Sequence, residues 1–207
     1  MNTSIKAILG ITCAVSSVSP VLGTPVASTE RTLTISTGAP ARAPIGWVEF
    51  CADNSRACTP QAATGSDATL TAKTWKLLVR VNNLVNEQIQ PMTDMEHHGV
   101  VEKWSFPDDG YGDCEDYVLL KRRMLGELGL PMHSLLITVV RDAKGEGHAV
   151  LTAKTDKGEF ILDNQNPDIL LWSDTAYRFV KRQSQSDPNV WVSLGDTRPA
   201  VATATSR

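Results

Sequence analysis

The chain has 207 residues, which is enough for one domain of ordinary size with short flanking segments. Hydrophobic residues make up 42% and charged residues 21%, and this balance excludes global disorder. The formal net charge is -3, and the longest basic run is Lys121-Arg122-Arg123, so the composition indicates no nucleic-acid partner. We expect that triplet on the solvated face of a helix.

The N-terminus has the pattern of an export signal, which we assign to residues 1–27. Lys6 supplies a positive charge, Ala7–Val21 is mostly apolar, and small residues follow. Pro20 and several serines interrupt the apolar run, so it is unsuited to a permanent membrane anchor. A buried first helix is the alternative. The signal predicts a periplasmic or secreted protein without stable membrane insertion.

The rest of the chain divides by composition into three parts. Residues 28–45 are rich in Thr, Ser, Ala and Pro and predict a flexible leader. Residues 46–197 carry the periodic segments of a single domain, and residues 198–207 form a small, polar tail that we expect to be disordered.

Two helices are predicted in the first half of the domain. Trp75, Leu78, Val81 and Val85 recur at helical spacing, and Pro91 ends that helix. After an irregular segment, a second helix begins at about Cys114 and ends before Gly129 and Pro131. Its apolar face is formed by Tyr117, Leu120, Met124 and Leu128.

From residue 134 the period falls to two, which is typical of strands. We predict strands over 134–140, 148–155, 159–164, 177–183 and 190–194. Helices followed by an antiparallel meander indicate an α+β fold.

Once the export signal is removed, three cysteines remain. Cys51 and Cys58 flank a polar, turn-forming stretch, where a small disulfide loop fits. Cys114 is then an unpaired thiol. It is either a small buried side chain or a nucleophile.

The segment Gly110-Tyr111-Gly112-Asp113-Cys114-Glu115-Asp116-Tyr117 favours the nucleophile. Its glycines permit a tight backbone entry, and Cys114 falls in the first turn of the predicted helix. The free N–H groups and the dipole at that end favour a thiolate and could stabilise an oxyanion.

A base and an orienting acid are expected on the following hairpin. If Asp156 and Lys157 form a two-residue turn, Asp163 pairs opposite Val150 and shares a face with His148. Asp163 would then orient His148, and His148 would exchange the proton with Cys114. The alternatives are a structural histidine and a turn-forming aspartate.

Asp113, Glu115 and Asp116 surround the proposed nucleophile with negative charge, which opposes a thiolate. One interpretation is helix capping, with Asp113 as the N-cap residue and Asp116 at the third helical position. The other is a Ca²⁺ ion that would offset the three carboxylates. The sequence lacks the HExxH and CxxC patterns of common zinc sites.

Taken together, Trp104, the Gly110–Tyr117 segment, Lys121-Arg122, Gly147–Leu151 and Leu162-Asp163-Asn164 resemble the bacterial transglutaminase-like cysteine proteinases, which include LapG-type periplasmic proteases. The upstream Asn82, Asn86 and Asp94 also match. The resemblance covers about residues 45–195.

The resemblance implies a papain/transglutaminase-like cysteine protease fold with Cys114, His148 and Asp163 as catalytic triad. It also implies Ca²⁺ dependence, with Asp113, Glu115 and Asp116 near the ion. LapG-type members imply a surface adhesin or envelope protein as substrate and a membrane receptor that sequesters the protease. Transglutaminase, amidase or peptidoglycan-directed chemistry is the enzymatic alternative, and a non-catalytic calcium- or adhesin-binding module is the other.

Overall fold

The computed structural model describes residue 1 and residues 33–60 and 67–196. The expected export signal over residues 1–27 and the expected tail over residues 198–207 lie almost entirely outside these residues, and both stay predictions. The described part from residue 33 onward is one compact unit that holds all the elements below.

Seven strands form one antiparallel sheet in the order β1-β9-β8-β4-β5-β6-β7. In the middle of the sheet, the consecutive strands β4, β5 and β6 pair with one another as the predicted antiparallel meander. The strands are β1 (Thr37–Ala41), β4 (Leu135–Arg141), β5 (Gly147–Thr155), β6 (Gly158–Leu162), β7 (Leu170–Leu171), β8 (Arg178–Gln183) and β9 (Trp191–Leu194).

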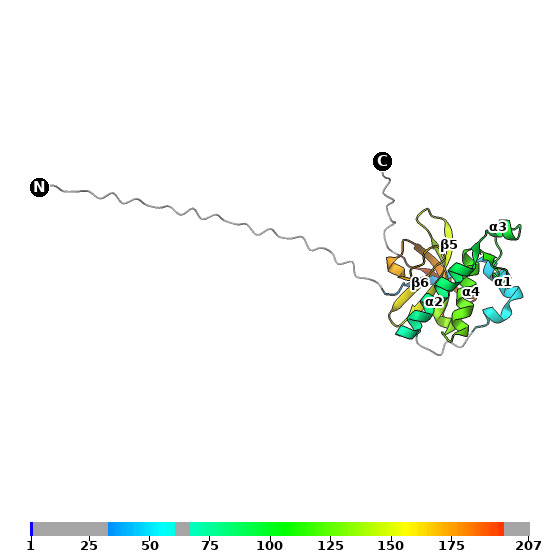
Figure 1. Ribbon diagram of the computed structural model, residues 1–207, viewed down its shortest axis with the longest axis horizontal. Helices are drawn as coiled ribbons and strands as arrows, with labels where there is room; N and C mark the ends of the chain where they lie inside the picture. The colour runs from blue at the N-terminus through cyan, green and yellow to red at the C-terminus, as the bar shows by residue number, and fades with distance from the viewer. Residues whose placement is uncertain (2–32, 61–66, 197–207) are drawn as a thin grey trace. The chain divides into compact units, whose positions relative to one another are not determined.

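The helices are α1 (Ile45–Asp53), α2 (Ala72–Gln88), α3 (Asp94–His97) and α4 (Cys114–Glu127), with 3-10 turns η1 (Ser55–Cys58), η2 (Met132–Ser134) and η3 (Trp172–Asp174). The two long helices, α2 and α4, match the predicted ones and pack against each other, while α4 also lies on β5 and β4 (Figure 1). Thr71 caps α2 by accepting a hydrogen bond from the Thr74 N–H at 3.1 Å.

Successive side chains of β5 point to opposite faces of the sheet, so this strand contributes residues to two hydrophobic cores. Ala149, Leu151 and Ala153 belong to the larger core, between the sheet and the helices, whereas Val150 belongs to a smaller core on the other face. Helices on one face of an antiparallel sheet confirm the predicted α+β fold.

The flexible leader predicted over residues 28–45 is wrong for Thr37–Ala41. These residues form β1, an edge strand that pairs with β9. Gly38 and Pro40 are uncommon in strands, so the sequence gives no strand signal here. Pro is tolerated in an edge strand, because the side that faces away from the sheet needs no backbone N–H donor. Helix α1 was also missed; it is anchored by Trp47 and Phe50, which are three residues apart and buried.

A short parallel pair of strands joins the two ends of the segment predicted to be irregular. Strands β2 (Gln90–Pro91) and β3 (Tyr111–Gly112) pair directly after α2 and directly before Cys114. The pairing ties the end of α2 to the entry of α4, so the backbone that leads to Cys114 is held by an ordered neighbour.

The expectation that Lys121-Arg122-Arg123 is solvated is wrong for its first two residues. Lys121 is 0% and Arg122 6% exposed, because both lie on the face of α4 that packs on the sheet and α2. Arg122 donates hydrogen bonds to the carbonyls of Leu135 and Ala57.

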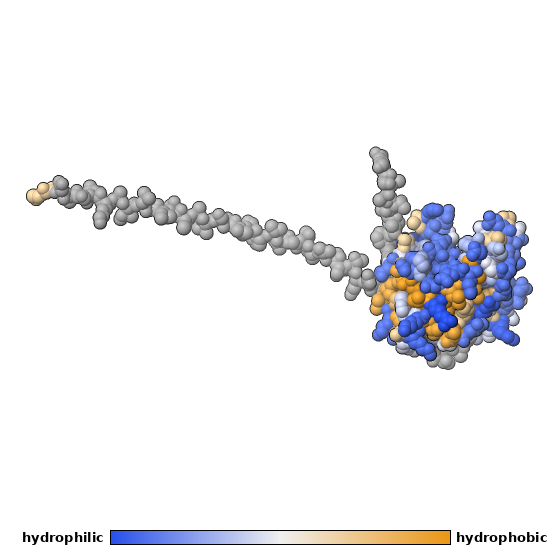
Figure 2. All heavy atoms as spheres, viewed as in Figure 1, coloured by the Kyte–Doolittle hydropathy of each residue, from blue (hydrophilic) through white to orange (hydrophobic). Residues whose placement is uncertain are grey.

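The outward positions of α2 are charged, with Lys73, Lys76 and Arg80 exposed. Figure 2 shows hydrophilic and hydrophobic surface interspersed on this side of the domain. Among the helices of residues 33–60 and 67–196, none is long and apolar enough to cross a membrane.

Candidate active site and cation site

Cys114 is the first residue of α4 and the free cysteine of the described chain. The other two described cysteines, Cys51 and Cys58, form the disulfide that their spacing suggested. The backbone before Cys114 needs a glycine, because a Cβ at Gly112 would lie 2.7 Å from the Asp116 Cβ. The sequence therefore positions one unpaired sulfur at a helix N-terminus.

Among the described residues, two polar groups approach this sulfur. The thiol donates a hydrogen bond to Glu115 Oε2 at 3.1 Å, and the backbone N–H of Ala149 on β5 points toward it. Ala149 directly follows His148, so the start of α4 lies against the strand that carries the histidine. Among the hydrogen bonds of the described residues, none joins the thiol to the His148 ring.

The pKa of the Cys114 thiol is raised, not lowered. Burial is the largest cause, followed by the negative charge of Glu115 and the hydrogen bond to it. Burial and, after it, the neighbouring carboxylates therefore outweigh the favourable effect that the helix N-terminus is expected to have on the thiolate.

His148 and Asp163 meet as the hairpin geometry predicted. Thr155 pairs with Gly158 and Leu151 with Leu162, so the turn between β5 and β6 contains two residues. His148 Nε2 lies 2.9 Å from Asp163 Oδ1, and the two side chains are 3% and 2% exposed. A buried imidazole held by a carboxylate can act as a general base.

Asp163 is held from several sides. Its Oδ1 also accepts the Gln165 N–H at 3.0 Å, and its Oδ2 accepts the Tyr177 hydroxyl at 2.5 Å. Burial acts to raise the pKa of Asp163, but the hydrogen bonds from His148, Tyr177 and Gln165 outweigh it and leave the pKa lowered. Asp163 is therefore ionised at neutral pH.

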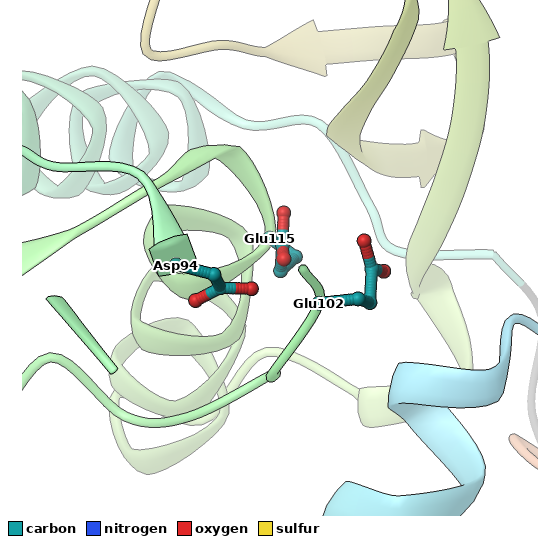
Figure 3. A group of neighbouring side chains, drawn as sticks. All are labelled: Asp94, Glu102 and Glu115. Atoms are coloured by element: carbon teal, nitrogen blue, oxygen red, sulfur yellow. The ribbon is translucent and has the colours of Figure 1, made fainter. Parts of the chain in front are cut away.

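Five carboxylates gather beside Cys114, from three separate segments. Asp94 begins α3, Glu102 lies in the following loop, and the other three surround Cys114. Ligand atoms of Asp94, Glu102 and Glu115 lie within 4.8 Å of one another (Figure 3), as do those of Asp94, Asp113 and Asp116. The three residues predicted near a cation thus divide between two overlapping groups that share Asp94.

Asp94, Glu115 and Asp116 are buried and Asp113 is half-buried, whereas Glu102 is exposed. The buried carboxylates repel one another because little water screens their charge. Burial, with the charge of Asp113, raises the pKa of Glu115 to about 9, and burial raises that of Asp116 to about 8. Burial also raises the pKa of Asp113. One oxygen of each, Asp113 Oδ1, Glu115 Oε1 and Asp116 Oδ2, is buried without a hydrogen-bond partner. Oxygen donors in excess of their hydrogen bonds fit a hard cation such as Ca²⁺.

The structure gives less support to the alternative that these acidic residues cap helix α4. Asp113 occupies the N-cap position, but its side chain makes no capping hydrogen bond to α4. Asp116 Oδ1 instead accepts the N–H of Ser105, in the loop that follows Glu102. The acidic residues therefore face a shared centre more than they satisfy the helix end.

Sequence reasoning did not assign three residues that the fold brings to the site. Asp94 is indicated only by the family resemblance, Glu102 belongs to no motif, and Tyr177 begins a predicted strand. None carries a local pattern that indicates a site; each reaches it through tertiary contacts.

The chain is similar to a known protein family and to solved structures of one protein. The sequence profile described as bacterial transglutaminase-like cysteine proteinase matches residues 37–199. The chain is 26% identical to calcium-bound LapG of Legionella pneumophila, with 62% of this chain and 73% of that chain covered and a TM-score of 0.50. For the EGTA-treated form these values are 27%, 60%, 72% and 0.49.

None of the curated proteins compared with the chain matches it. The profile match nevertheless spans most of the chain, including β1, α4 and the β5–β6 hairpin. The chain therefore belongs to the bacterial transglutaminase-like cysteine proteinases, a family of cysteine peptidases.

Proposed function

We propose that the chain is an exported, calcium-dependent cysteine endopeptidase that cuts an adhesin-type surface protein or another protein of the cell envelope. Its triad is Cys114, His148 and Asp163. The observation that carries this proposal is the buried 2.9 Å contact between His148 Nε2 and Asp163 Oδ1. His148 lies on β5, and the N–H of the next residue, Ala149, points toward the Cys114 sulfur.

The three residues divide the chemistry in the usual way. The Cys114 sulfur attacks the carbonyl carbon of a peptide bond, and His148 transfers the thiol proton to the departing amine. Asp163 fixes the ring and stabilises its protonated form. Water then cleaves the thioester and regenerates the thiol, while the first N–H groups of α4 stabilise the oxyanion in both steps.

Calcium is proposed because the donor set fits it. Asp113, Glu115 and Asp116, with Asp94 and Glu102, would hold the ion, and three of them carry buried oxygens without partners. A bound cation supplies positive charge beside the thiol. Glu115, which accepts the thiol hydrogen bond, would then no longer favour the protonated sulfur.

Export is supported by the Cys51–Cys58 disulfide, since structural disulfides persist in oxidising compartments. A protease in the periplasm or outside the cell meets envelope and surface proteins as substrates. Transglutamination or amidase chemistry would use the same thioester, and the acceptor, water or an amine, decides between them.

The first test measures the thiol itself. Iodoacetamide alkylation of the Cys114 peptide, followed by mass spectrometry near pH 7, should be faster with Ca²⁺ than with EGTA. His148→Ala should slow it by at least about tenfold if the imidazole activates the sulfur, whereas His133→Ala, on η2, is the matched control. Equal rates in wild type and His148→Ala would overturn the triad.

The second test identifies substrate and outcome. Envelope proteins released by cells with the wild-type chain are compared with those from Cys114→Ser cells. Candidate substrates are then incubated with purified protein and a biotinylated primary amine. Shortened fragments without biotin support the endopeptidase, while biotin incorporation into an intact protein would identify a transglutaminase.

A further inference from the structure

Tyr177 occupies a position that the triad alone leaves unexplained. It lies between η3 and β8, and its hydroxyl donates to Asp163 Oδ2 at 2.5 Å. Its ring centroid lies 5.5 Å from that of His148. Tyr177 thus contacts the acid and lies beside the base.

With this hydrogen bond, each of the two oxygens of the Asp163 carboxylate has a hydrogen-bond donor. His148 Nε2 and the Gln165 N–H occupy Oδ1, and the Tyr177 hydroxyl occupies Oδ2. With donors on both oxygens, the carboxylate is fixed in rotation about its Cβ–Cγ bond. Without the hydroxyl, a buried charged oxygen would lose its partner, and the carboxylate could turn away from His148.

We propose that Tyr177 is a positioning residue that acts through Asp163 to hold the His148 ring in its working orientation. The proposal rests on the proposed function, because it assumes that His148 and Asp163 serve Cys114. Tyr177 itself is assigned no contact with the substrate or with the attacked bond.

The ring of Tyr177 has a separate, structural role. It packs against the smaller core, which contains Val150, Ile161 and Phe179. Tyr177→Phe keeps this packing and removes only the hydroxyl, so it separates the two roles. Tyr117→Phe is a matched control, because the buried Tyr117 hydroxyl likewise donates a short hydrogen bond, at 2.6 Å, but to the backbone oxygen of Ile89.

The experiment is a double-mutant cycle on the full chain with saturating Ca²⁺. The rate of Cys114 alkylation by iodoacetamide at pH 7 is measured for wild type, Tyr177→Phe, Asp163→Asn and the double variant. Tyr177→Phe should slow the reaction about tenfold, the size expected for one hydrogen bond to a charged group. The double variant should react within about twofold of Asp163→Asn alone, because the two residues act as one unit.

A second measurement reports on the imidazole directly. In ¹H–¹⁵N spectra, the His148 Nε2 proton should be shifted downfield in wild type and Tyr117→Phe, and it should broaden by exchange in Tyr177→Phe. An unchanged resonance together with an unchanged alkylation rate would overturn the role of Tyr177.

The outcomes separate this inference from the proposed function. If Asp163→Asn alone leaves alkylation unchanged, the triad fails and the inference fails with it. If Asp163→Asn slows alkylation but Tyr177→Phe does not, or if the two effects multiply, the triad stands and the positioning role is wrong.

Discussion

Gly112 and Asp116 approach so closely that a Cβ on Gly112 would lie 2.7 Å from the Asp116 Cβ and 2.8 Å from its Oδ2. The contact links the backbone that enters α4 to a carboxylate of the acidic cluster. Because the same backbone leads to Cys114 two residues later, this glycine positions both the candidate nucleophile and the candidate cation site.

We expect Gly112→Ala to weaken Ca²⁺ binding by about tenfold or more, because the methyl group must displace Asp116, and overpacking of this kind costs about 1–3 kcal/mol. Calorimetric titration of the metal-free protein measures the change. Gly147→Ala is the matched control: it adds a methyl group beside His148, where a Cβ meets nothing within 4 Å. Equal Ca²⁺ affinity in the two variants would contradict the role of the close contact.

The acidic cluster predicts how the stability of the metal-free protein depends on pH. The pKa values of about 9 for Glu115 and about 8 for Asp116 lie above their unfolded values. The folded chain therefore retains protons that the unfolded chain releases, and stability falls as pH rises from about 4.5 toward 8. In EGTA, the midpoint of thermal unfolding should be lower at pH 8 than at pH 5.5.

Saturating Ca²⁺ should remove most of this slope, since the ion replaces the protons. The increase in the unfolding midpoint on adding Ca²⁺ is then larger at pH 8 than at pH 5.5. Glu115→Gln, which carries no charge at any pH, should show a shallower slope in EGTA than wild type. A metal-free protein whose stability rises over this range would be inconsistent with a buried, repelling cluster.

The parts of the molecule that local rules govern were predictable. Helical spacing placed α2 and α4 to within a few residues. The hairpin of β5 and β6 followed from a two-residue turn, because period-two alternation then fixes which side chains share a face. The pairing of His148 with Asp163 is a consequence of that register, so the sequence alone could predict it.

What sequence reasoning missed depends on contacts between distant segments. Asp94 and Glu102 join the cluster only because α3 and its following loop lie against the start of α4. Strand β1 carries Gly and Pro and shows no alternation, so its pairing with β9 has no local signal. Tyr177 reaches Asp163 from another strand connection, and no spacing rule relates the two.

Burial of charge was the least predictable feature. Lys121 is 0% exposed, and its ammonium nitrogen has no hydrogen-bond partner among the described residues; it lies 5.9 Å from the centroid of the Tyr117 ring. Burial lowers the pKa of Lys121 to about 7, partly opposed by the charge of Asp163. The unfolded chain keeps the ordinary value near 10.4 and therefore binds more protons between pH 7 and 10.

Protonation of Lys121 thus opposes folding at pH 7, and the contribution of Lys121 to the free energy of unfolding should increase as pH rises above 7. We expect Lys121→Met to increase the free energy of unfolding at pH 7 by about 1–3 kcal/mol, as replacements of buried charge by apolar groups do. It should also flatten the rise in stability between pH 7 and 9. Urea unfolding with saturating Ca²⁺ measures both effects without interference from the acidic cluster.

Lys76→Met, on the exposed side of α2, is the control and should change stability by less than about 0.5 kcal/mol. Destabilisation by Lys121→Met, with an unchanged pH slope, would mean that the ammonium has a stabilising partner in solution.

The Cys51–Cys58 disulfide should increase the free energy of unfolding without changing the reactivity of Cys114. It joins α1 to the next turn across a sequence separation of seven, and removing it from a loop this short costs about 2.5 kcal/mol by loop-closure entropy. The double variant Cys51→Ala, Cys58→Ala should lose about that much free energy of unfolding in urea.

Alkylation of Cys114 with Ca²⁺ present should nevertheless stay within about twofold of wild type under conditions where the variant is folded. The reason is geometric: the disulfide joins α1 to η1, whereas His148 lies on β5, Asp163 directly follows β6 and Cys114 begins α4. Cys114→Ser, which keeps the disulfide, should show the reverse pattern, with full stability and no alkylation at that position. A large loss of Cys114 reactivity in the folded double variant would show that α1 and η1 help to shape the active site.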